Sequence, residues 1–358
     1  MPIAGIIKKQ KRRMHPYKGK VFVAMSGGVD SSVAALLLQQ QGYSIVGVYM
    51  RPWQPKGFAC LWEQDRADAL RVATQLDIPF ETWDFSREYA RHVARPMVRG
   101  YREGITPNPD VECNRHIKFG YFYEQARAQG ADAIATGHYA RVATRNGKRV
   151  LTTAADNTKD QTYFLWGVNG RHLPNVLFPL GGMLKSEVRA IAKKAGLITA
   201  LKKDSQGVCF VGPIDMKSYL LSAVPSKSGT IFCTDGRVLG THDGAAYYTI
   251  GQRHGLDIKD GGGPYFVVDK DIKRNIITVG AETELYRSTA AVTDVHWIGA
   301  RPPVGKSLLA KIRYRTPSVR VQLKGTRVIF ARPVRAVAPG QSIVFYDGRT
   351  VVGGALLA

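Results

Sequence analysis

The sequence is poor in cysteine: its 358 residues include only four, scattered along the chain at Cys60, Cys113, Cys209 and Cys233. This number and spacing exclude the disulfide scaffold of a small secreted domain. No stretch approaches the roughly 18 consecutive apolar residues that a membrane-spanning helix needs. The apolar N-terminal stretch is too short for a signal peptide, and basic residues follow it rather than precede it. The sequence therefore predicts a cytoplasmic protein with no membrane partner, where a functional cysteine pair would serve catalysis rather than structure.

Acidic residues are scarce as well, with 28 Asp and Glu against 51 Lys and Arg, which gives a net charge of +23. Such an excess favours an anionic partner, either nucleic acid or an acidic membrane surface; a basic surface that mainly keeps the protein soluble is the alternative. The 37 glycines and 18 prolines are too few for collagen or a low-complexity chain. With 44% hydrophobic residues, a chain of this length can bury a sizeable core, and its length predicts two or three domains.

The first recognisable unit begins after a basic stretch at residues 1–18 that contains no acidic residue. This stretch predicts either a flexible N-terminal arm that touches phosphates or a simple disordered extension. Residues 21–25 (VFVAM) form a short, unbroken apolar run, which is typical of a strand buried on both faces. Residues 32–41 carry apolar side chains at helical spacing, and residues 45–50 form a second apolar run. Strand, glycine-containing turn, helix and strand together make one βαβ unit.

The same alternation continues along the first half of the chain. Helices are predicted at 65–76, 119–129 and 183–200, and strands at 80–84 and within 131–140. This pattern predicts an α/β fold with a doubly wound parallel sheet. After about residue 212, short β-rich runs separated by Gly, Asp-Gly and Pro-Gly turns predict small antiparallel barrels instead. The expected segments are a basic arm (1–18), an α/β domain (19–212), a small central β-rich domain (213–282) and a C-terminal β-barrel (283–358).

The loop SGGVDSS at residues 26–32 has the features of a phosphate-binding turn. Glycines let the backbone approach phosphate oxygens, while helix N-terminal N–H groups and serine hydroxyls complete an anion cradle. The loop lacks the lysine of a Walker A motif and the spacing of a dinucleotide-binding fingerprint. Asp30 would repel bound phosphates unless a cation intervenes, and Mg²⁺ is the natural candidate. Met50 ends the next strand, where its thioether could lie against a base or simply fill the core.

Two of the cysteines lie in segments whose neighbouring residues could make a thiol reactive. In TPNPDVECNRHIKF, the spacing of Asp110 and Cys113 can put a proton-transfer group beside a thiol. Cys209 stands in KKDSQGVCFVG, where a lysine at 202–203 could lower the pKa of its thiol. Taken alone, each of these cysteines is more often a small buried hydrophobe than a nucleophile. The other two cysteines keep that interpretation.

Seven motifs change this balance, because they occur together and in order between residues 24 and 348. They are AMSGGVDSSVAA, TPNPDVECNRHIKF, ATGHYAR, KDQTYFLW, DSQGVCFVG, YYTIGQRHGL and PGQSIVFYDG. The combination resembles the tRNA-specific 2-thiouridylases (the MnmA/TrmU family of PP-loop ATP pyrophosphatases) over nearly the full chain. The resemblance implies an N-terminal PP-loop domain, a small central domain and a C-terminal β-barrel. It also implies a sulfurtransferase that 2-thiolates the wobble uridine of tRNA at the expense of ATP.

In such an enzyme, ATP is split to pyrophosphate and AMP, with Mg²⁺ accompanying the nucleotide, and AMP is transferred to the uracil C2 oxygen. The resemblance implies that Cys209 carries a persulfide delivered by a sulfur-relay protein or a cysteine desulfurase. Cys113 would resolve the persulfide and leave a Cys113–Cys209 disulfide, and Asp110 would be the acid/base residue. The positions that match the ATP site are Ala24, Met25, Ser26, Gly27, Gly28, Val29, Asp30, Ser31, Met50 and Gly137.

The implied tRNA contacts begin with the target base, which must be flipped out because its C2 is not approachable inside a stacked loop. Arg313 and Tyr314 combine a phosphate-binding cation with a stacking surface. Taken individually, several of the matching residues would be interpreted as ordinary core or turn residues. The matching positions are Asn108, Pro109 and Asp110 at the target base, and His138, Lys159, Asp160, Gln161, Arg313, Tyr314 and Gln341 elsewhere.

Two other functions compete with thiolation as explanations of these motifs. Another PP-loop adenylating enzyme, such as an amide-forming ligase, needs an amine acceptor and no cysteine pair. A non-catalytic tRNA-binding protein with a degenerate loop would show no tRNA-stimulated formation of AMP. The intact SGGVDSS loop and the two cysteines of the matched motifs favour the thiouridylase.

Overall fold

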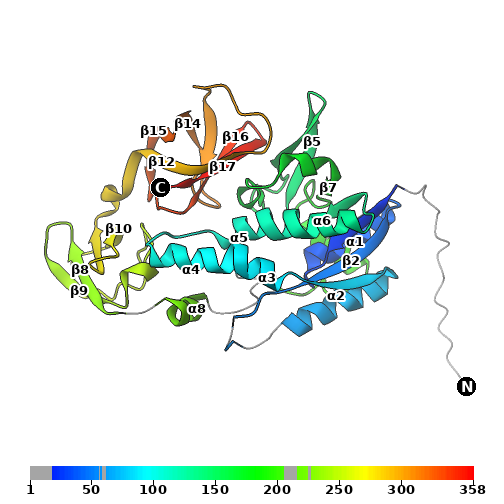
Figure 1. The fold of residues 1–358 in the computed structure, drawn as a ribbon, viewed down its shortest axis with the longest axis horizontal. Helices are drawn as coiled ribbons and strands as arrows, with labels where there is room; N and C mark the ends of the chain where they lie inside the picture. The colour runs from blue at the N-terminus through cyan, green and yellow to red at the C-terminus, as the bar shows by residue number, and fades with distance from the viewer. Residues whose placement is uncertain (1–17, 56, 59–61, 205–215, 225–226) are drawn as a thin grey trace, which may run out of the picture.

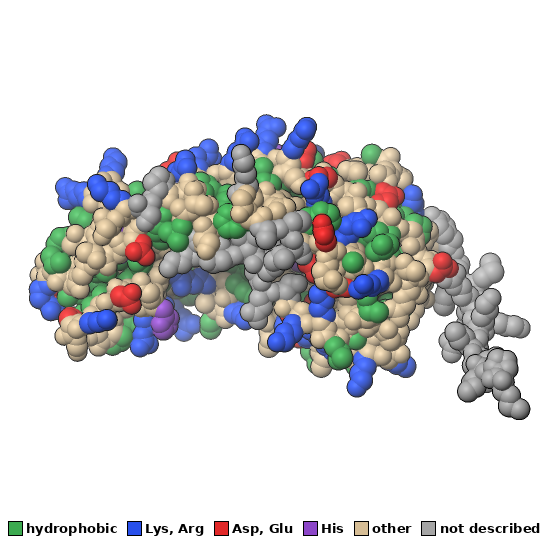
Figure 2. All heavy atoms as spheres, turned by 90° about the horizontal axis from the view of Figure 1, so that it is seen from below, with side chains coloured by type: hydrophobic (Ala, Val, Ile, Leu, Met, Phe, Trp, Pro, Cys, Tyr) green, Lys and Arg blue, Asp and Glu red, His purple; other side chains and the backbone are tan. Residues whose placement is uncertain are grey.

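The computed structural model describes residues 18–358 except 56, 59–61, 205–215 and 225–226. Most of the basic arm, Cys60 and Cys209 therefore lie outside the described residues. Within the described part, no helix is both long enough and apolar enough to cross a bilayer. Lysine and arginine side chains are spread over the face drawn in Figure 2 rather than gathered in one patch.

The N-terminal part is built on a five-stranded parallel sheet, which confirms the predicted fold class. Its strand order is β3-β2-β1-β4-β7. Nearly every residue of the central strand β1 is buried, as expected for a sheet covered by helices on both faces. Helices α1, α2 and α7 share one apolar core with the sheet, and α6 contributes to the core on the other face. The strands are β1 (Lys20–Ala24), β2 (Ser44–Arg51), β3 (Phe80–Asp84), β4 (Ala133–Ala135) and β7 (Val176–Leu177).

The helices on this sheet begin and end close to the predicted positions, with one clear difference. The helices are α1 (Val29–Gln40), α2 (Trp62–Leu76), α6 (Phe122–Ala128) and α7 (Lys185–Lys194). The helix predicted over 183–200 is shorter than expected and ends at Lys194. Gly196 has a φ of +63°, the left-handed conformation that terminates helices, so the chain turns away there.

Two helical rods extend from the sheet toward the rest of the molecule. The first joins α3 (Ser86–Tyr89), η1 (Ala90–Ala94) and α4 (Arg95–Arg102); the second joins α5 (Pro109–Glu112), η2 (Cys113–Tyr121) and α6. The two rods lie side by side (Figure 1), with η1 in contact with α5 and α3 in contact with η2. Both η1 and η2 are π-helical, a wide geometry that is frequent at functional sites.

The central part is a small mixed sheet with the strand order β10-β11-β8-β9, and not the antiparallel barrel that the sequence analysis expected here. Strands β8 and β11 are parallel and the outer pairs are antiparallel. Its core is a compact apolar cluster that includes Ile231, Val267 and Ile277. Helix α8 (Met216–Ala223) precedes this sheet, whose strands are β8 (Gly229–Cys233), β9 (Val238–His242), β10 (Phe266–Asp271) and β11 (Ile276–Gly280).

The C-terminal part is a closed six-stranded barrel, as predicted. The order β12-β15-β14-β13-β16-β17 closes because β12 also pairs with β17. The residues of alternate positions fill its interior, Val321 and Phe345 among them. The strands are β12 (Tyr286–Trp297), β13 (Leu308–Lys311), β14 (Val319–Lys324), β15 (Arg327–Arg335), β16 (Ser342–Asp347) and β17 (Thr350–Leu357).

A hairpin from the N-terminal part adds to the barrel sheet, which the sequence analysis did not predict. Strands β5 (Ala140–Arg145) and β6 (Lys148–Thr153) pair with each other, and β6 pairs with β17 through Thr152 and Thr350. Asn146 and Gly147 form its turn, with φ values of +50° and +71°. Asn-Gly between alternating residues is a strong hairpin signal, so this element was detectable from the sequence.

Candidate functional site

The phosphate-binding loop lies where the order of the parallel sheet reverses. Strands β1 and β4 are neighbours, and the loop after β1 faces the segment after β4 at the carboxyl ends of both. Ligands of open α/β sheets bind at such a switch point. A Cβ on Gly137 would lie 2.8 Å from the backbone nitrogen of Ser31. Only glycine therefore lets the segment after β4 lie against the first turn of α1.

The loop itself is held in shape by its serines and glycines. The backbone N–H of Ser26 donates to Ser31 Oγ over 3.1 Å, and the Ser31 and Ser32 hydroxyls donate to the carbonyl of Gly28 over 3.1 and 2.8 Å. Gly27 has a φ of +75°, and a Cβ there would lie 2.2 Å from the carbonyl oxygen of Asp65. The N-cap of α1 is Gly28, so no side chain caps the helix and its first N–H groups are available to an anion.

Asp30, in the first turn of α1, is compensated by a lysine that the sequence analysis missed. Lys185, the first residue of α7, donates to both oxygens of the Asp30 carboxylate over 2.7 and 2.8 Å. The Tyr139 hydroxyl donates to the same carboxylate over 3.0 Å, and burial together with Asp30 raises the pKa of that phenol. The protein itself therefore supplies a cation beside Asp30, and the Mg²⁺ that the sequence analysis expected with the nucleotide stays a prediction.

A second carboxylate, Asp204, lies on the other side of Lys185. Its oxygens are 2.9 Å from Lys185 Nζ, 2.9 Å from Lys159 Nζ and 2.6 Å from Arg189 Nη2. Burial alone would raise the pKa of Asp204, but hydrogen bonds from Lys185 and Lys159 outweigh it and hold the pKa well below its usual range. Lys159, which the family resemblance matched to a tRNA contact, is thus engaged in an ion pair here.

The remaining residues matched to the ATP site lie at the carboxyl ends of β1 and β2. Ala24 ends β1, and the backbone N–H of Met25 donates to the carbonyl of Val48 over 2.8 Å. Met25 and Met50 are both buried and belong to the apolar cores on opposite faces of the sheet. The two methionines therefore contribute to packing at the edge where the loop begins.

The segment with Asp110 and Cys113 begins the second helical rod. Asn108 is the N-cap of α5, and its Oδ1 accepts a hydrogen bond from the backbone N–H of Asp110 over 3.2 Å. Pro109 occupies the first helical position, where its missing N–H costs nothing. Asp110 is partly exposed, whereas Cys113 is fully buried one turn further on, at the start of the π-helix.

The loop just before this segment is tied to both other parts of the molecule. The backbone N–H of Thr106 donates to the carbonyl of Pro339 over 2.9 Å, and Gln341 Nε2 donates to the carbonyl of Thr106 over 2.8 Å. The Thr106 hydroxyl lies 3.2 Å from that of Thr249 in the central part. Gln341, matched by resemblance to a tRNA contact, therefore also fixes the loop that leads to Asn108.

Arg313 and Tyr314 lie close to this junction, at one end of the barrel. Arg313 Nη2 donates to the carbonyl of Ile250 in the central part over 2.8 Å and lies 3.3 Å from the carbonyl of Ala336. The Tyr314 ring packs against Phe164 with a centroid separation of 4.6 Å. Arg313 thus has a structural task in addition to any contact with a ligand.

His138, Asp160 and Gln161 are engaged within the fold. His138 Nδ1 lies 2.7 Å from the Thr136 hydroxyl, and burial and the neighbouring Lys118 hold the pKa of His138 well below its usual range. Asp160 is buried and accepts hydrogen bonds from the backbone N–H of Ala154 and the hydroxyl of Thr162. Gln161 Oε1 accepts one from the backbone N–H of Tyr139 over 2.9 Å.

The structure thus brings Ser31 and Gly137 together at the first turn of α1, whereas Met50 lies in the core on the other face of the sheet. Gln341 binds the loop that leads to Asn108 and Asp110. Cys209 lies outside the described residues. Lys202, proposed from the sequence as a cation near Cys209, pairs with Asp65 and Asp68 of α2 over 2.7 and 2.6 Å. No local pattern in the sequence indicates Lys185, because its partner Asp30 is 155 residues away in the chain.

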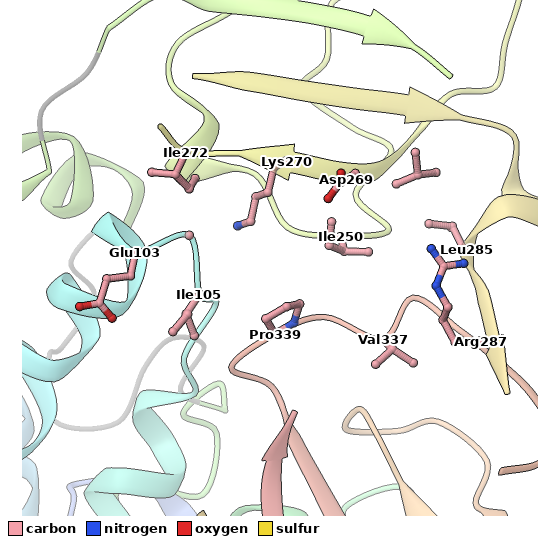
Figure 3. A pocket seen from close by; sticks show the side chains of 12 residues that line it. Glu103, Ile105, Ile250, Asp269, Lys270, Ile272, Leu285, Arg287, Val337 and Pro339 are labelled. Carbon is pink, nitrogen blue, oxygen red and sulfur yellow. The ribbon is translucent and has the colours of Figure 1, made fainter. Parts of the chain in front are cut away.

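A cavity of about 370 Å³ lies at the same junction (Figure 3). It is bounded by the chain after α4, by β10, by the start of β12 and by the chain after β15. Lys270 extends into it, and its ammonium donates to the carbonyl of Tyr248 over 2.7 Å. Burial lowers the pKa of Lys270 to about 8.

This lowered pKa predicts a stability effect that depends on pH. Between about pH 8 and 10.5 the unfolded chain keeps more protons on Lys270 than the folded protein, so the penalty for burying the charge is fully present below pH 8 and disappears above that window. We expect Lys270→Met to raise the free energy of unfolding by about 1 kcal/mol at pH 7, allowing for solvent screening of this half-buried group. Urea unfolding at pH 7 and pH 10 measures the gain, which should shrink at pH 10.

The matched control is Lys273→Met, because Lys273 is exposed on the turn after β10. This variant should leave the free energy of unfolding unchanged at both pH values. An equal loss of stability at both pH values in Lys270→Met would contradict the prediction, since it would mean that the hydrogen bond to Tyr248 outweighs the burial penalty.

Comparison with known proteins extends over the whole described chain. The tRNA methyl transferase HUP domain matches residues 19–213, the tRNA methyl transferase PRC-barrel domain 217–281, and the aminomethyltransferase β-barrel domain 287–357. The tRNA-specific 2-thiouridylase MnmA 2 of Geobacillus kaustophilus is 47% identical over 350 residues, covering 95% of this chain and 94% of that protein. The tRNA-specific 2-thiouridylase MnmA of Listeria welshimeri is 47% identical over 346 residues, covering 94% and 93%. A 4-thiouridine synthetase–RNA complex with bound ATP is 19% identical over 58% of this chain and 50% of that chain, and its TM-score of 0.36 is too low to support a functional conclusion.

Proposed function

The chain belongs to the family of tRNA-specific 2-thiouridylases, and on that premise we propose that it converts the wobble uridine of tRNA to 2-thiouridine with consumption of ATP. The observation that supports this most directly is the glycine- and serine-rich loop at the uncapped start of α1, where Lys185 balances the charge of Asp30. Two of the matching family models have methyl transferase in their descriptions, but the relatives that are 47% identical are named as thiouridylases. The reaction would take place in the cytoplasm, where tRNA is present.

The chemistry assigns a separate task to each part of the site. The uracil C2 oxygen is a poor leaving group, so it first attacks the α-phosphorus of ATP and pyrophosphate departs. Sulfur then adds to C2, and the oxygen leaves with AMP. Because a persulfide sulfur is a soft and readily ionised nucleophile, positioning contributes more to this step than strong base catalysis.

We propose that the residues around the first turn of α1 bind ATP. The uncapped N–H groups of α1 and the Ser26 and Ser31 hydroxyls suit the phosphates, and Gly27 and Gly137 keep the backbone close. Mg²⁺ would enter with the nucleotide and neutralise phosphate charge, held mainly by phosphate oxygens and water. Asp30 is the carboxylate within this loop that fits such an ion, and in the protein alone Lys185 balances its charge.

The sulfur-transfer residues are proposed from the family match. Cys209 would receive a persulfide from a sulfur-relay protein or a cysteine desulfurase. As its terminal sulfur passes to C2, the thiolate of Cys113 would bond to Cys209 Sγ and leave a disulfide for later reduction. Asp110, partly exposed one turn before Cys113, would be the acid/base residue of the reaction.

Substrate binding is proposed at the junction of the three parts. The Asn108–Asp110 segment would meet the flipped base, and Arg313 with Tyr314 would hold the RNA next to it. His138, Asp160 and Gln161 would support these contacts through the loops that they brace. The division into a PP-loop domain (19–212), a central domain (213–282) and a tRNA-binding barrel (283–358) is part of the same proposal.

The decisive experiment is incubation with tRNA, Mg·ATP and a persulfide donor, followed by nucleoside analysis. We expect 2-thiouridine in an amount that matches the AMP released, and neither product without tRNA. Formation of AMP without 2-thiouridine would redirect the reaction to another acceptor, as in an amide-forming ligase. Absence of both products would contradict the enzymatic function altogether.

A further inference from the structure

Three cations converge on the carboxylate of Asp204, next to the phosphate-binding loop. Lys159 Nζ, Lys185 Nζ and Arg189 Nη2 all lie within 2.6 to 2.9 Å of its oxygens. One exposed ion pair contributes little and needs only one cation, so three around a single carboxylate exceed what a surface ion pair requires. The arrangement has the geometry of an anion-binding site that is occupied by a side chain of the protein itself.

The Arg189 guanidinium and the backbone that carries the two lysines are held in place by contacts independent of Asp204. Arg189 Nη1 donates to the carbonyls of Ala200 and Lys202 over 2.9 and 2.6 Å, which fixes the guanidinium plane. The backbone N–H of Lys185 donates to the Asp156 carboxylate over 3.0 Å. The backbone N–H of Lys159 lies in a turn, 3.2 Å from the carbonyl of Asp156. These anchors keep the guanidinium and the attachment points of the two lysine side chains near one another without Asp204.

The cluster lies directly beside the proposed phosphate site. One ammonium, that of Lys185, contacts Asp204 on one side and Asp30 of the loop on the other. Asp156 is the other carboxylate close by, and its oxygens are engaged by Thr158 and the backbone of Lys185. An anion that extends from the first turn of α1 would therefore meet Lys185 first and Lys159 and Arg189 next.

We propose that Lys159, Lys185 and Arg189 form a binding site for the pyrophosphoryl group of ATP and for the pyrophosphate it becomes, and that Asp204 occupies this site until that group displaces it. The inference rests on the proposed ATP-dependent function for its ligand, although the site itself rests on the ion-pair geometry. Pyrophosphate carries several negative charges, so it replaces one carboxylate among three cations with a gain in electrostatic energy. The strong hold of these cations on Asp204, expressed in its lowered pKa, agrees with a site made for an anion.

This placement also gives Asp204 a positioning task. Asp204 is the last described residue before the segment that contains Cys209. When a phosphate group takes the three cations, the backbone at Asp204 loses its ion pairs. Occupancy of the nucleotide site and the anchoring of the chain at Asp204 are therefore thermodynamically linked.

The test is calorimetric titration of the full chain with inorganic pyrophosphate and Mg²⁺, without tRNA or sulfur donor. Asp204→Asn removes the competing charge, and we expect pyrophosphate to bind about tenfold more tightly than to the wild type. Lys159→Met should weaken binding by about fivefold. The matched control is Asp347→Asn, because Asp347 also contacts two cations, Lys306 and Arg145, but lies on the barrel. The control should bind pyrophosphate as the wild type does.

Unchanged or weaker pyrophosphate binding by Asp204→Asn would overturn the site. If that variant does not fold, Lys159→Met decides alone, and wild-type affinity in Lys159→Met would likewise overturn the site. If the wild type forms 2-thiouridine but the variants do not change pyrophosphate affinity as expected, the site is contradicted and the proposed function stands. If the wild type forms no AMP with tRNA, the proposed function is contradicted, and the pyrophosphate titrations still test the site independently.

Discussion

Cys113→Ser is expected to lower the rate of 2-thiouridine formation by at least about 100-fold, with tRNA-dependent release of pyrophosphate within about threefold of the wild type. The hydroxyl of serine cannot attack a persulfide sulfur at neutral pH, so sulfur would stay on Cys209 after activation of the base. Activation depends on the loop at α1 and not on Cys113, which lies on the second helical rod. The measurement is the ratio of 2-thiouridine to released pyrophosphate, with a persulfide donor in excess.

The matched control is Cys233→Ser, because Cys233 is also a buried cysteine but lies in β8 of the central sheet. Each change buries a hydroxyl in place of a thiol, so both variants carry the same kind of stability cost. Only Cys113→Ser should change the ratio of the two products. Cys113→Ala, which adds no polar atom to the fully buried position, should give the same ratio as Cys113→Ser. Wild-type turnover in both Cys113 variants would eliminate the resolving role.

The sheet and its phosphate loop were predictable because local signals and the fold agree there. Unbroken apolar runs such as residues 21–25 become buried parallel strands. A glycine-rich turn between a strand and a helix is likewise a local signal that few other structures share. The barrel was predictable as a class for the same reason, since turn residues recur at short intervals. The β5–β6 hairpin interrupts the α/β alternation and was not predicted, although Asn146-Gly147 indicates a turn.

The charge partners at the site could not be predicted in the same way. Lys185 is 155 residues from Asp30 in the chain, and an ion pair between helices leaves no local pattern. Asp160 and Gln161, which the resemblance matches to tRNA contacts, also accept hydrogen bonds from backbone N–H groups, and these contacts become visible only when the loops are placed in space. Sequence patterns therefore identified the elements of the site, while the structure was needed to assign the contacts between them.

Lys185→Met is expected to lower kcat/KM for ATP by about 100-fold, equivalent to about 3 kcal/mol, because it leaves two carboxylates beside the phosphates without their shared cation. Lys185 Nζ lies 2.7 Å from Asp30 and 2.9 Å from Asp204, and the side chain is only 14% exposed. Methionine keeps the length and packing of the lysine stem but removes its charge. Lys185→Arg keeps the charge and should recover most of the loss. The measurement is tRNA-dependent release of pyrophosphate at varied ATP.

Lys202→Met provides the matched control, since Lys202 also bridges two carboxylates, those of Asp65 and Asp68, but neither belongs to the phosphate-binding loop. Its kinetics with ATP should remain within about threefold of the wild type, as expected for an ion pair that serves structure alone. Equal losses in the two methionine variants would mean that Lys185 acts through stability.

The effects of substitutions at Lys185 and at Asp204 on pyrophosphate affinity should also depend on each other. Asp204→Asn strengthens pyrophosphate binding partly by freeing Lys185, so the gain should be smaller when Lys185 is already methionine. A double-mutant cycle with Lys185→Met, Asp204→Asn and the double variant measures this coupling by titration with Mg²⁺ and pyrophosphate. Strict additivity would contradict a shared site, because independent contacts add. A coupling of at least about threefold in affinity is the expected result for residues in direct contact.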